Sequence, residues 1–160
     1  MKKTILFFIV VISMMGCSSS SSKQETLPSF DILLPDSSNH FNTAAIQDGV
    51  PVALLYFSPD CEHCQKETES ILHHINALKQ MQFIFVTNDP FDRLKVFESN
   101  YSLSQYPNIK LGRDENFFLL RYFKGISPPC LVLYDRHKEK QNVFQGETSI
   151  DTIISSINKF

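Results

Sequence analysis

The spacing of apolar residues predicts a chain that alternates between strands and helices from about residue 29 onward. Residues 52–57 form an unbroken apolar run of strand length, as expected for a central strand that is covered on both faces. Further short apolar runs, separated by loop-forming residues, complete the set of predicted strands: 29–34, 81–86, 108–111, 131–134 and 141–144. The last two surround a polar loop and therefore predict a hairpin.

Apolar residues at intervals of three and four predict helices between these strands, over about 61–80, from 90 to 101, over 114–123 and from 148 onward. Asp89 is the expected N-cap of the second helix, with Pro90 at its first position. Thr148 is the expected start of the last, with Asp151 as a partial capping-box partner. Residues 36–49 are expected to form a loop with one helical turn. The order of elements predicts a three-layer α/β domain without internal repeats.

The first residues have the pattern of an export signal. Lys2 and Lys3 precede the apolar run 5–12, which is shorter than the ~20 residues of a spanning helix. The ending Met14-Met15-Gly16-Cys17 resembles a bacterial lipobox, so we expect residues 1–16 to be a lipoprotein signal peptide and Cys17 to carry the lipid. The alternative is an ordinary secretory signal followed by an incidental cysteine.

A serine-rich segment follows Cys17 and predicts a flexible tether over 17–26, with the folded domain at 27–160. The resemblance to lipoproteins implies the bacterial cell envelope, facing the periplasm. By resemblance to enterobacterial lipoproteins, Ser18 after the cysteine favours the outer membrane over the inner one.

Charge and composition exclude two other classes of protein. The 160 residues hold 15 Lys and Arg against 17 Asp and Glu, and removal of residues 1–16 changes the net charge from −2 to −4. A chain without a clustered basic excess is not expected to bind nucleic acid. A hydrophobic content of 42% excludes wholesale disorder.

The candidate chemistry lies in Cys61-Glu62-His63-Cys64, which follows the apolar strand after a short turn. Cys61 is expected at a helix N-terminus, where the helix dipole and free amide groups stabilise a thiolate. Cys64 falls on the same helical face as Ile71, so it should point into the core. An accessible attacking sulfur beside a shielded resolving sulfur suits disulfide exchange.

Three neighbouring side chains are candidates for tuning the ionisation of this pair. Asp60 and Glu62 are negative and disfavour a thiolate, whereas a protonated His63 favours it. The sequence therefore leaves the direction of electron flow, oxidant or reductant, open.

Residues 56–67 resemble the active-site segment of thioredoxin-like thiol-disulfide oxidoreductases, in particular the membrane-tethered TlpA/ResA type, which often has an acid at the position of Glu67. Residues 125–134 are similar to the cis-proline loop of that family. The resemblance implies a thioredoxin-like fold, with a central mixed sheet flanked by helices. It assigns catalytic roles to Cys61, Cys64 and Pro129, with Pro128 as the alternative cis-proline.

The same resemblance implies protein disulfides or dithiols as substrates, a membrane thiol-redox partner, and no cofactor. Three positions depart from the family pattern. Asp60 stands where a Trp is usual, and Leu55 where thioredoxins carry a buried acid. Glu67 is the nearest replacement for that acid, or else a surface residue. Pro128 has no N–H, so a backbone donor expected to hold substrate would be missing if Pro129 is cis.

Other interpretations of the cysteines remain open. A zinc site needs two more ligands, but Cys130 stands alone and His73 and His74 lie two turns or more from Cys64, so we expect no metal. Cys130 follows the proline loop and is either a third thiol that traps or resolves an intermediate, or a buried core residue.

Two other functions also remain open. Ser58 lies three residues before Cys61, as in thiol peroxidases of the peroxiredoxin type, although Leu54 replaces the proline of that family. In that alternative Cys61 would be the peroxidatic thiol. The second open function is that of a non-enzymatic module that carries a metal or haem.

Overall fold

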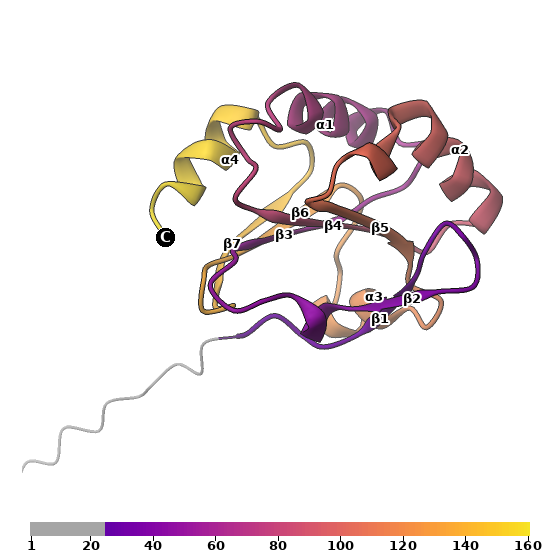
Figure 1. Cartoon of the computed structure of the whole chain (residues 1–160), viewed down its shortest axis with the longest axis horizontal. Helices are drawn as coiled ribbons and strands as arrows, with labels where there is room; N and C mark the ends of the chain where they lie inside the picture. Colours follow the sequence, from indigo (N-terminus) through magenta and orange to yellow (C-terminus); the bar gives the residue numbers. More distant parts are fainter. Residues whose placement is uncertain (1–24) are drawn as a thin grey trace, which may run out of the picture.

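The computed structural model describes residues 25–160, which form one mixed sheet of seven strands in the order β2-β1-β5-β4-β3-β6-β7 (Figure 1). The predicted signal peptide, Cys17 and residues 17–24 of the predicted tether lie outside the described residues. The strands are β1 (Asp31–Leu33), β2 (His40–Asn42), β3 (Val52–Tyr56), β4 (Gln82–Thr87), β5 (Ile109–Arg113), β6 (Cys130–Tyr134) and β7 (Lys140–Gln145). Strands β3, β4 and β5 are parallel, and the other pairings are antiparallel.

Helices cover both faces of the sheet, which confirms the predicted three-layer architecture (Figure 1). Helices α1 (Glu62–His73), α2 (Phe91–Tyr101) and α4 (Ile150–Ile157) lie on one face, and α3 (Phe118–Phe123) lies on the other. Two 3₁₀ turns complete the structure, Thr43–Ala45 before β3 and Leu103–Gln105 after α2. No helix in the described part of the chain is long and apolar enough to cross a membrane.

The alternation of side chains along β3 divides the core into two clusters. Ala53 and Leu55 face the layer of α1, α2 and α4, whereas Leu54 and Tyr56 face the layer of α3. Each of these residues is buried, so β3 is covered on both sides as its unbroken apolar run predicts. Full burial of one side chain such as Leu55 contributes about 1.5–3 kcal/mol, so the position of β3 in the sheet is strongly determined.

Several element ends differ from their predicted positions. Helix α1 ends at His73 instead of continuing to about residue 80, and a series of turns carries Leu78 into the same core cluster. Turns can present apolar residues to a core at spacings close to those of a helix, so the pattern alone overestimates the helix. Strand β2 lies in the segment 36–49 that the sequence predicts as loop, because a three-residue strand with one apolar residue gives no alternating pattern.

Two predicted helix caps are wrong by one residue. Pro90 is the N-cap of α2, and Asp89 instead exchanges hydrogen bonds with the hydroxyl of Thr87. Ser149, not Thr148, caps α4 by accepting a hydrogen bond from the Thr152 amide at 3.3 Å. At α4 two adjacent residues able to cap compete, whereas at α2 the side chain of Asp89 is engaged by Thr87 and Pro90 makes no side-chain capping bond.

The last two residues of the predicted tether, Glu25 and Thr26, form backbone pairs with the folded domain. The Lys140 amide donates to the Glu25 carbonyl at 2.8 Å, and Thr26 forms a bridge with Glu139. The side chains of Glu25 and Lys140 also form an ion pair. The chain therefore joins the sheet beside β7 before the predicted start of the domain at Leu27.

A close contact between β5 and β1 leaves no room for a side chain at Gly112. A Cβ atom on Gly112 would lie 2.8 Å from three side-chain carbons of Ile32, which is fully buried. We expect Gly112→Ala to lower the free energy of unfolding by about 1–3 kcal/mol, measured by urea denaturation. Combining it with Ile32→Val should cost less than the sum of the two single changes, and strict additivity would contradict this account.

Candidate active site

The cysteine pair lies where β3 passes into α1. Cys61 is the N-cap of α1, and its sulfur accepts a hydrogen bond from the Cys64 amide at 3.4 Å. Its carbonyl accepts the first intrahelical bond, from the Gln65 amide at 3.0 Å. The position predicted for Cys61 is therefore confirmed, with its sulfur among the free amides of the first helical turn. Within residues 25–160 the three cysteines are free thiols.

The two sulfurs of the pair lie in different environments, as their positions on the helix predict. Cys61 is half-buried, whereas Cys64 is completely buried in the core cluster beneath α1. Burial raises the pKa of the Cys64 thiol well above its ordinary value, and a hydrogen bond with Cys61 raises it further. At neutral pH Cys64 is therefore a protonated, shielded thiol, and Cys61 is the sulfur that a substrate can reach.

Glu67 lies one turn after Cys64 and is 1% exposed, so the interpretation of this residue as a surface side chain is wrong. Among the described residues, neither carboxyl oxygen has a hydrogen-bond partner of normal geometry. Burial raises the pKa of Glu67 from 4.5 to about 8, the Thr148 amide partly opposes this shift, and Glu147 adds to it. Glu67 is thus a buried acid that titrates near neutral pH.

Glu67 is electrostatically linked to two of the three thiols. Its charge contributes to the raised pKa of Cys64 and, after burial, to that of Cys130, which rises to about 11. Perturbed titratable groups that influence one another in this way are characteristic of functional sites. The position of thioredoxin's buried acid is occupied by the fully buried Leu55, so Glu67 brings an acid to the pair from the helix and not from β3.

Cys130 begins β6 and is 1% exposed. It pairs in the sheet with Tyr56 and belongs to the core cluster on the side of α3, whereas Cys64 belongs to the cluster on the side of α1. This burial agrees with a core cysteine. A redox role for Cys130 stays a prediction.

The peptide bond between Pro128 and Pro129 is cis, which places the cis-proline at Pro129 as predicted. Pro129 is buried and its carbonyl accepts the Gly146 amide at 2.8 Å, whereas Pro128 is exposed. Pro128, the residue before the cis-proline, therefore has a backbone carbonyl but no amide donor.

The two residues between the cysteines each lie against a side chain able to carry the opposite charge. His63 Nδ1 lies 2.8 Å from Glu147 Oε2, which connects α1 to the loop before α4. Glu62 lies 2.7 Å from Lys66 on the same helix, and this hydrogen bond lowers the pKa of Glu62. Because both pairs are solvent-exposed, each contributes little to stability.

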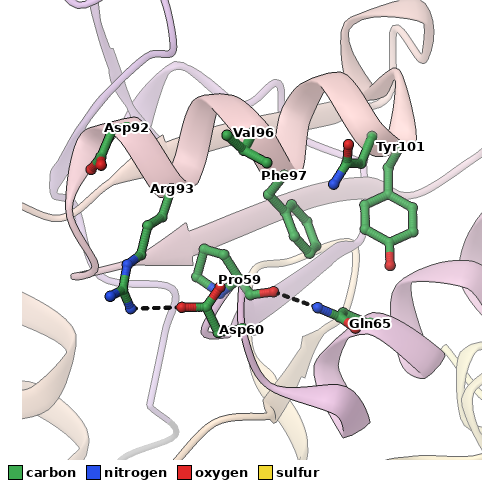
Figure 2. Close-up of a pocket in the computed structure, with 9 residues that line it drawn as sticks. Pro59, Asp60, Gln65, Asp92, Arg93, Val96, Phe97 and Tyr101 are labelled. Atoms are coloured by element: carbon green, nitrogen blue, oxygen red, sulfur yellow. Dashed lines mark hydrogen bonds and ion pairs between the residues drawn. The ribbon is translucent and has the colours of Figure 1, made fainter.

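Asp60 is held by a residue that the sequence did not indicate. Its Oδ2 atom lies 2.6 Å from Nη1 of Arg93 on α2 (Figure 2). Gln65 fixes the other end of the same turn by donating to the Pro59 carbonyl at 2.8 Å. No local sequence signal connects Asp60 with a side chain 33 residues later.

The same contacts border a hollow of about 300 Å³ between the active-site turn and α2. Figure 2 shows Val96 and Phe97 above the turn, with Tyr101 at the far end. The hollow begins at Asp60, directly beside Cys61, and its lining combines apolar and charged side chains.

The histidines and acids do not assemble a metal centre in the described part of the chain, where no group of three or more ligating side chains converges. His74 Nδ1 instead contacts the Ser70 carbonyl at 2.9 Å, and its ring packs edge-on against His73.

No known protein-family model and no curated protein matches the sequence. Solved structures do match its fold. A secreted Mycobacterium tuberculosis disulfide oxidoreductase, described as homologous to E. coli DsbE, has a TM-score of 0.67 at 18% identity, over 82% of this chain and 96% of its own. A putative thioredoxin from Neisseria meningitidis has a TM-score of 0.69 at 20% identity, over 85% of this chain and 89% of its own. The peroxidoxin BcpB from M. tuberculosis has a TM-score of 0.66 at 16% identity, over 86% of this chain and 96% of its own. The likeness establishes the predicted thioredoxin-like fold.

Burial of Glu67 predicts a dependence of stability on pH. The pKa of Glu67 is higher in the folded state than in the unfolded state. Its contribution to the free energy of unfolding is therefore complete below about pH 4.5 and is lost as the pH rises towards 8. Glu67→Gln removes this loss. We expect the variant to gain about 4 kcal/mol relative to wild type between pH 5 and pH 8.5, measured by urea denaturation. Glu69→Gln, on the exposed side of α1, should show no such gain.

Proposed function

We propose that this protein is an extracytoplasmic thiol-disulfide oxidoreductase, anchored by a lipid on Cys17, that exchanges disulfides with protein substrates through Cys61 and Cys64. The observation that carries the proposal is the asymmetry of the pair, with a reachable sulfur at the helix N-terminus and a fully buried one a turn below. The thioredoxin-like fold is shared with disulfide oxidoreductases and also with a peroxidoxin, so the fold alone does not decide between them.

The reaction begins at Cys61, because only this sulfur of the pair is accessible. Its thiolate attacks a substrate disulfide, a bond forms between Cys61 and one substrate sulfur, and the other substrate sulfur leaves as a thiolate. Cys64 then attacks Cys61, forms the Cys61–Cys64 disulfide and releases the second substrate thiolate. Two electrons pass from the protein to the substrate, and the reverse sequence oxidises a substrate dithiol.

Glu67 serves the second step as the acceptor of the Cys64 proton. Cys64 must lose a proton to attack, yet its burial opposes ionisation. With a pKa of about 8, the Glu67 carboxyl exchanges a proton readily near neutral pH. It lies three residues after Cys64 on the same buried face of α1, close enough for the two groups to influence each other's ionisation.

The first residues of the chain support the proposed cellular location. The apolar run 5–12 and the lipobox-like ending at Cys17 support export and lipidation, and Ser18 supports the outer membrane. A membrane thiol-redox partner would return the Cys61–Cys64 pair to its starting state after each turnover. Protein disulfides or dithiols are the substrates, and neither nucleic acid nor a cofactor takes part.

Trapping the mixed disulfide tests the proposed reaction. We expect Cys64→Ser to accumulate covalent adducts with envelope proteins, resolved on non-reducing gels, because the buried sulfur that releases the substrate is gone. Cys61→Ser should form no adducts and should lose insulin reduction. Cys130→Ser is the matched control for loss of a buried thiol and should form none. Adducts that persist without Cys61 would overturn the mechanism.

Replacing the buried acid tests the proton transfer. We expect Glu67→Gln to slow insulin reduction roughly 100-fold near pH 7, because general acid–base assistance is lost while the attacking sulfur stays in place. Glu69→Gln should retain the wild-type rate. Equal rates for the two variants would remove Glu67 from the mechanism.

A peroxidase of the peroxiredoxin type is the second candidate. The Ser58 carbonyl accepts the Cys61 amide at 3.1 Å, so the backbone of the serine in the peroxidase-like spacing is bonded to that of the candidate peroxidatic cysteine. In that reaction, peroxide would oxidise Cys61 to a sulfenic acid, which Cys64 would convert to a disulfide with loss of water. Rapid peroxide consumption by the wild type, without adducts in Cys64→Ser, would favour this candidate.

A further inference from the structure

Exposed aromatic and basic side chains occur together around α3. Phe117 is 48% exposed and Tyr122 is 40% exposed, although both are large and apolar. Arg121 and Lys124, from the same short segment, are exposed as well. We refer to these four residues as the α3 face. It lies across the sheet from α1, which carries the cysteine pair (Figure 1).

The backbone around α3 separates outward-facing aromatic rings from inward-facing ones. Phe118 stacks on Phe30 with ring centroids 5.0 Å apart and packs against the core, and Tyr122 stacks on Phe118 at 5.5 Å. Phe117, one residue earlier, has a φ of 52°, a left-handed conformation that is costly for a bulky residue. Lys124, at the other end of α3, has a φ of 41°. Backbone strain is concentrated at functional positions, and exposed large apolar side chains mark interaction sites, so both features draw attention to the α3 face.

The N-terminal segment leaves the domain beside this face. The Tyr122 hydroxyl donates to the Thr26 carbonyl at 3.5 Å, where the chain joins the sheet. Seven residues, 18–24, separate Cys17 from Glu25. At about 3.5 Å per residue, the span between them is at most roughly 28 Å. A lipid on Cys17 would therefore tether the domain at a point beside the α3 face and within this distance of the membrane surface.

We propose that the α3 face docks on a lipid bilayer that contains anionic headgroups. Aromatic rings are favoured at the level of the headgroups, and Arg and Lys are attracted to anionic lipid. The Arg121 guanidinium donates a hydrogen bond to the Asn116 carbonyl, which restricts its orientation. The acid nearest in the sequence, Glu115, is engaged by His40 at 3.5 Å and by Arg113 at 3.9 Å.

The proposal rests on the lipid anchor of the proposed function, because a surface of four residues is too small to hold a protein on a membrane by itself. A short tether supplies an effective concentration of about millimolar, at which such a weak surface is occupied. Because α1 lies on the opposite face of the sheet, docking leaves the cysteine pair accessible to substrates in the aqueous phase.

The absence of Trp from the sequence gives a direct test. Phe117→Trp and, as matched control, Val96→Trp each introduce a single tryptophan at an exposed apolar position. Val96 is 59% exposed on α2, in the opposite layer. The full chain, purified from membranes, is reconstituted in vesicles of phosphatidylglycerol and phosphatidylcholine with brominated acyl chains. We expect quenching and a blue shift of emission for Trp at 117 and neither for Trp at 96.

Charge reversal and lipid composition form the second arm. Arg121→Glu with Lys124→Glu, in the Phe117→Trp background, should lose most of the quenching, as should vesicles of phosphatidylcholine alone. Insulin reduction at the rate of the Phe117→Trp parent shows that the charge-reversed variant is folded. Equal quenching at both positions, no quenching at 117, or quenching unaffected by charge reversal would each overturn the proposal.

The mass of the peptide that contains Cys17 separates this inference from the proposed anchor. An unmodified Cys17 would refute lipidation and, with it, the docking that depends on the anchor. A lipidated Cys17 without quenching at position 117 would refute docking alone. Loss of insulin reduction in Cys61→Ser reports on the redox proposal and is independent of both.

Discussion

The contact between the first turns of α1 and the sheet is the constraint on which the site depends. It removes Cys64 and Glu67 from water while Cys61, at the helix end, keeps its access to solvent. The same burial that raises the pKa of Cys64 raises that of Glu67, so one packing interface sets the properties of both groups. A looser α1 would admit water, and the difference between the two sulfurs would shrink.

Strong local signals made the fold and the centre of the site predictable. The apolar run at β3, the Cys61–Cys64 spacing and the proline loop each specify their conformation within a few residues, and each was found where expected. Element ends were less predictable, because capping depends on competition between adjacent residues such as Thr148 and Ser149.

Contacts between distant residues account for most of what the sequence did not indicate. Arg93 and Glu147 each meet the active-site segment from another element, at Asp60 and His63. The burial of Glu67 is of the same kind, since it depends on how α1 sits on the sheet and not on residues beside it in sequence. A single sequence contains no record of such pairings, so they were found only in three dimensions.

The pairing of Glu25 and Thr26 with the residues around the start of β7 has a consequence for self-association. Strand β7 is last in the sheet, and the unpaired backbone groups of such a strand attract strands from other chains. The incoming N-terminal segment occupies the beginning of this edge through the Lys140 amide and the Thr26–Glu139 bridge. The segment that precedes Leu27 thus also shields part of an edge strand, and in the proposed lipid-anchored protein this would limit pairing between copies held on one membrane.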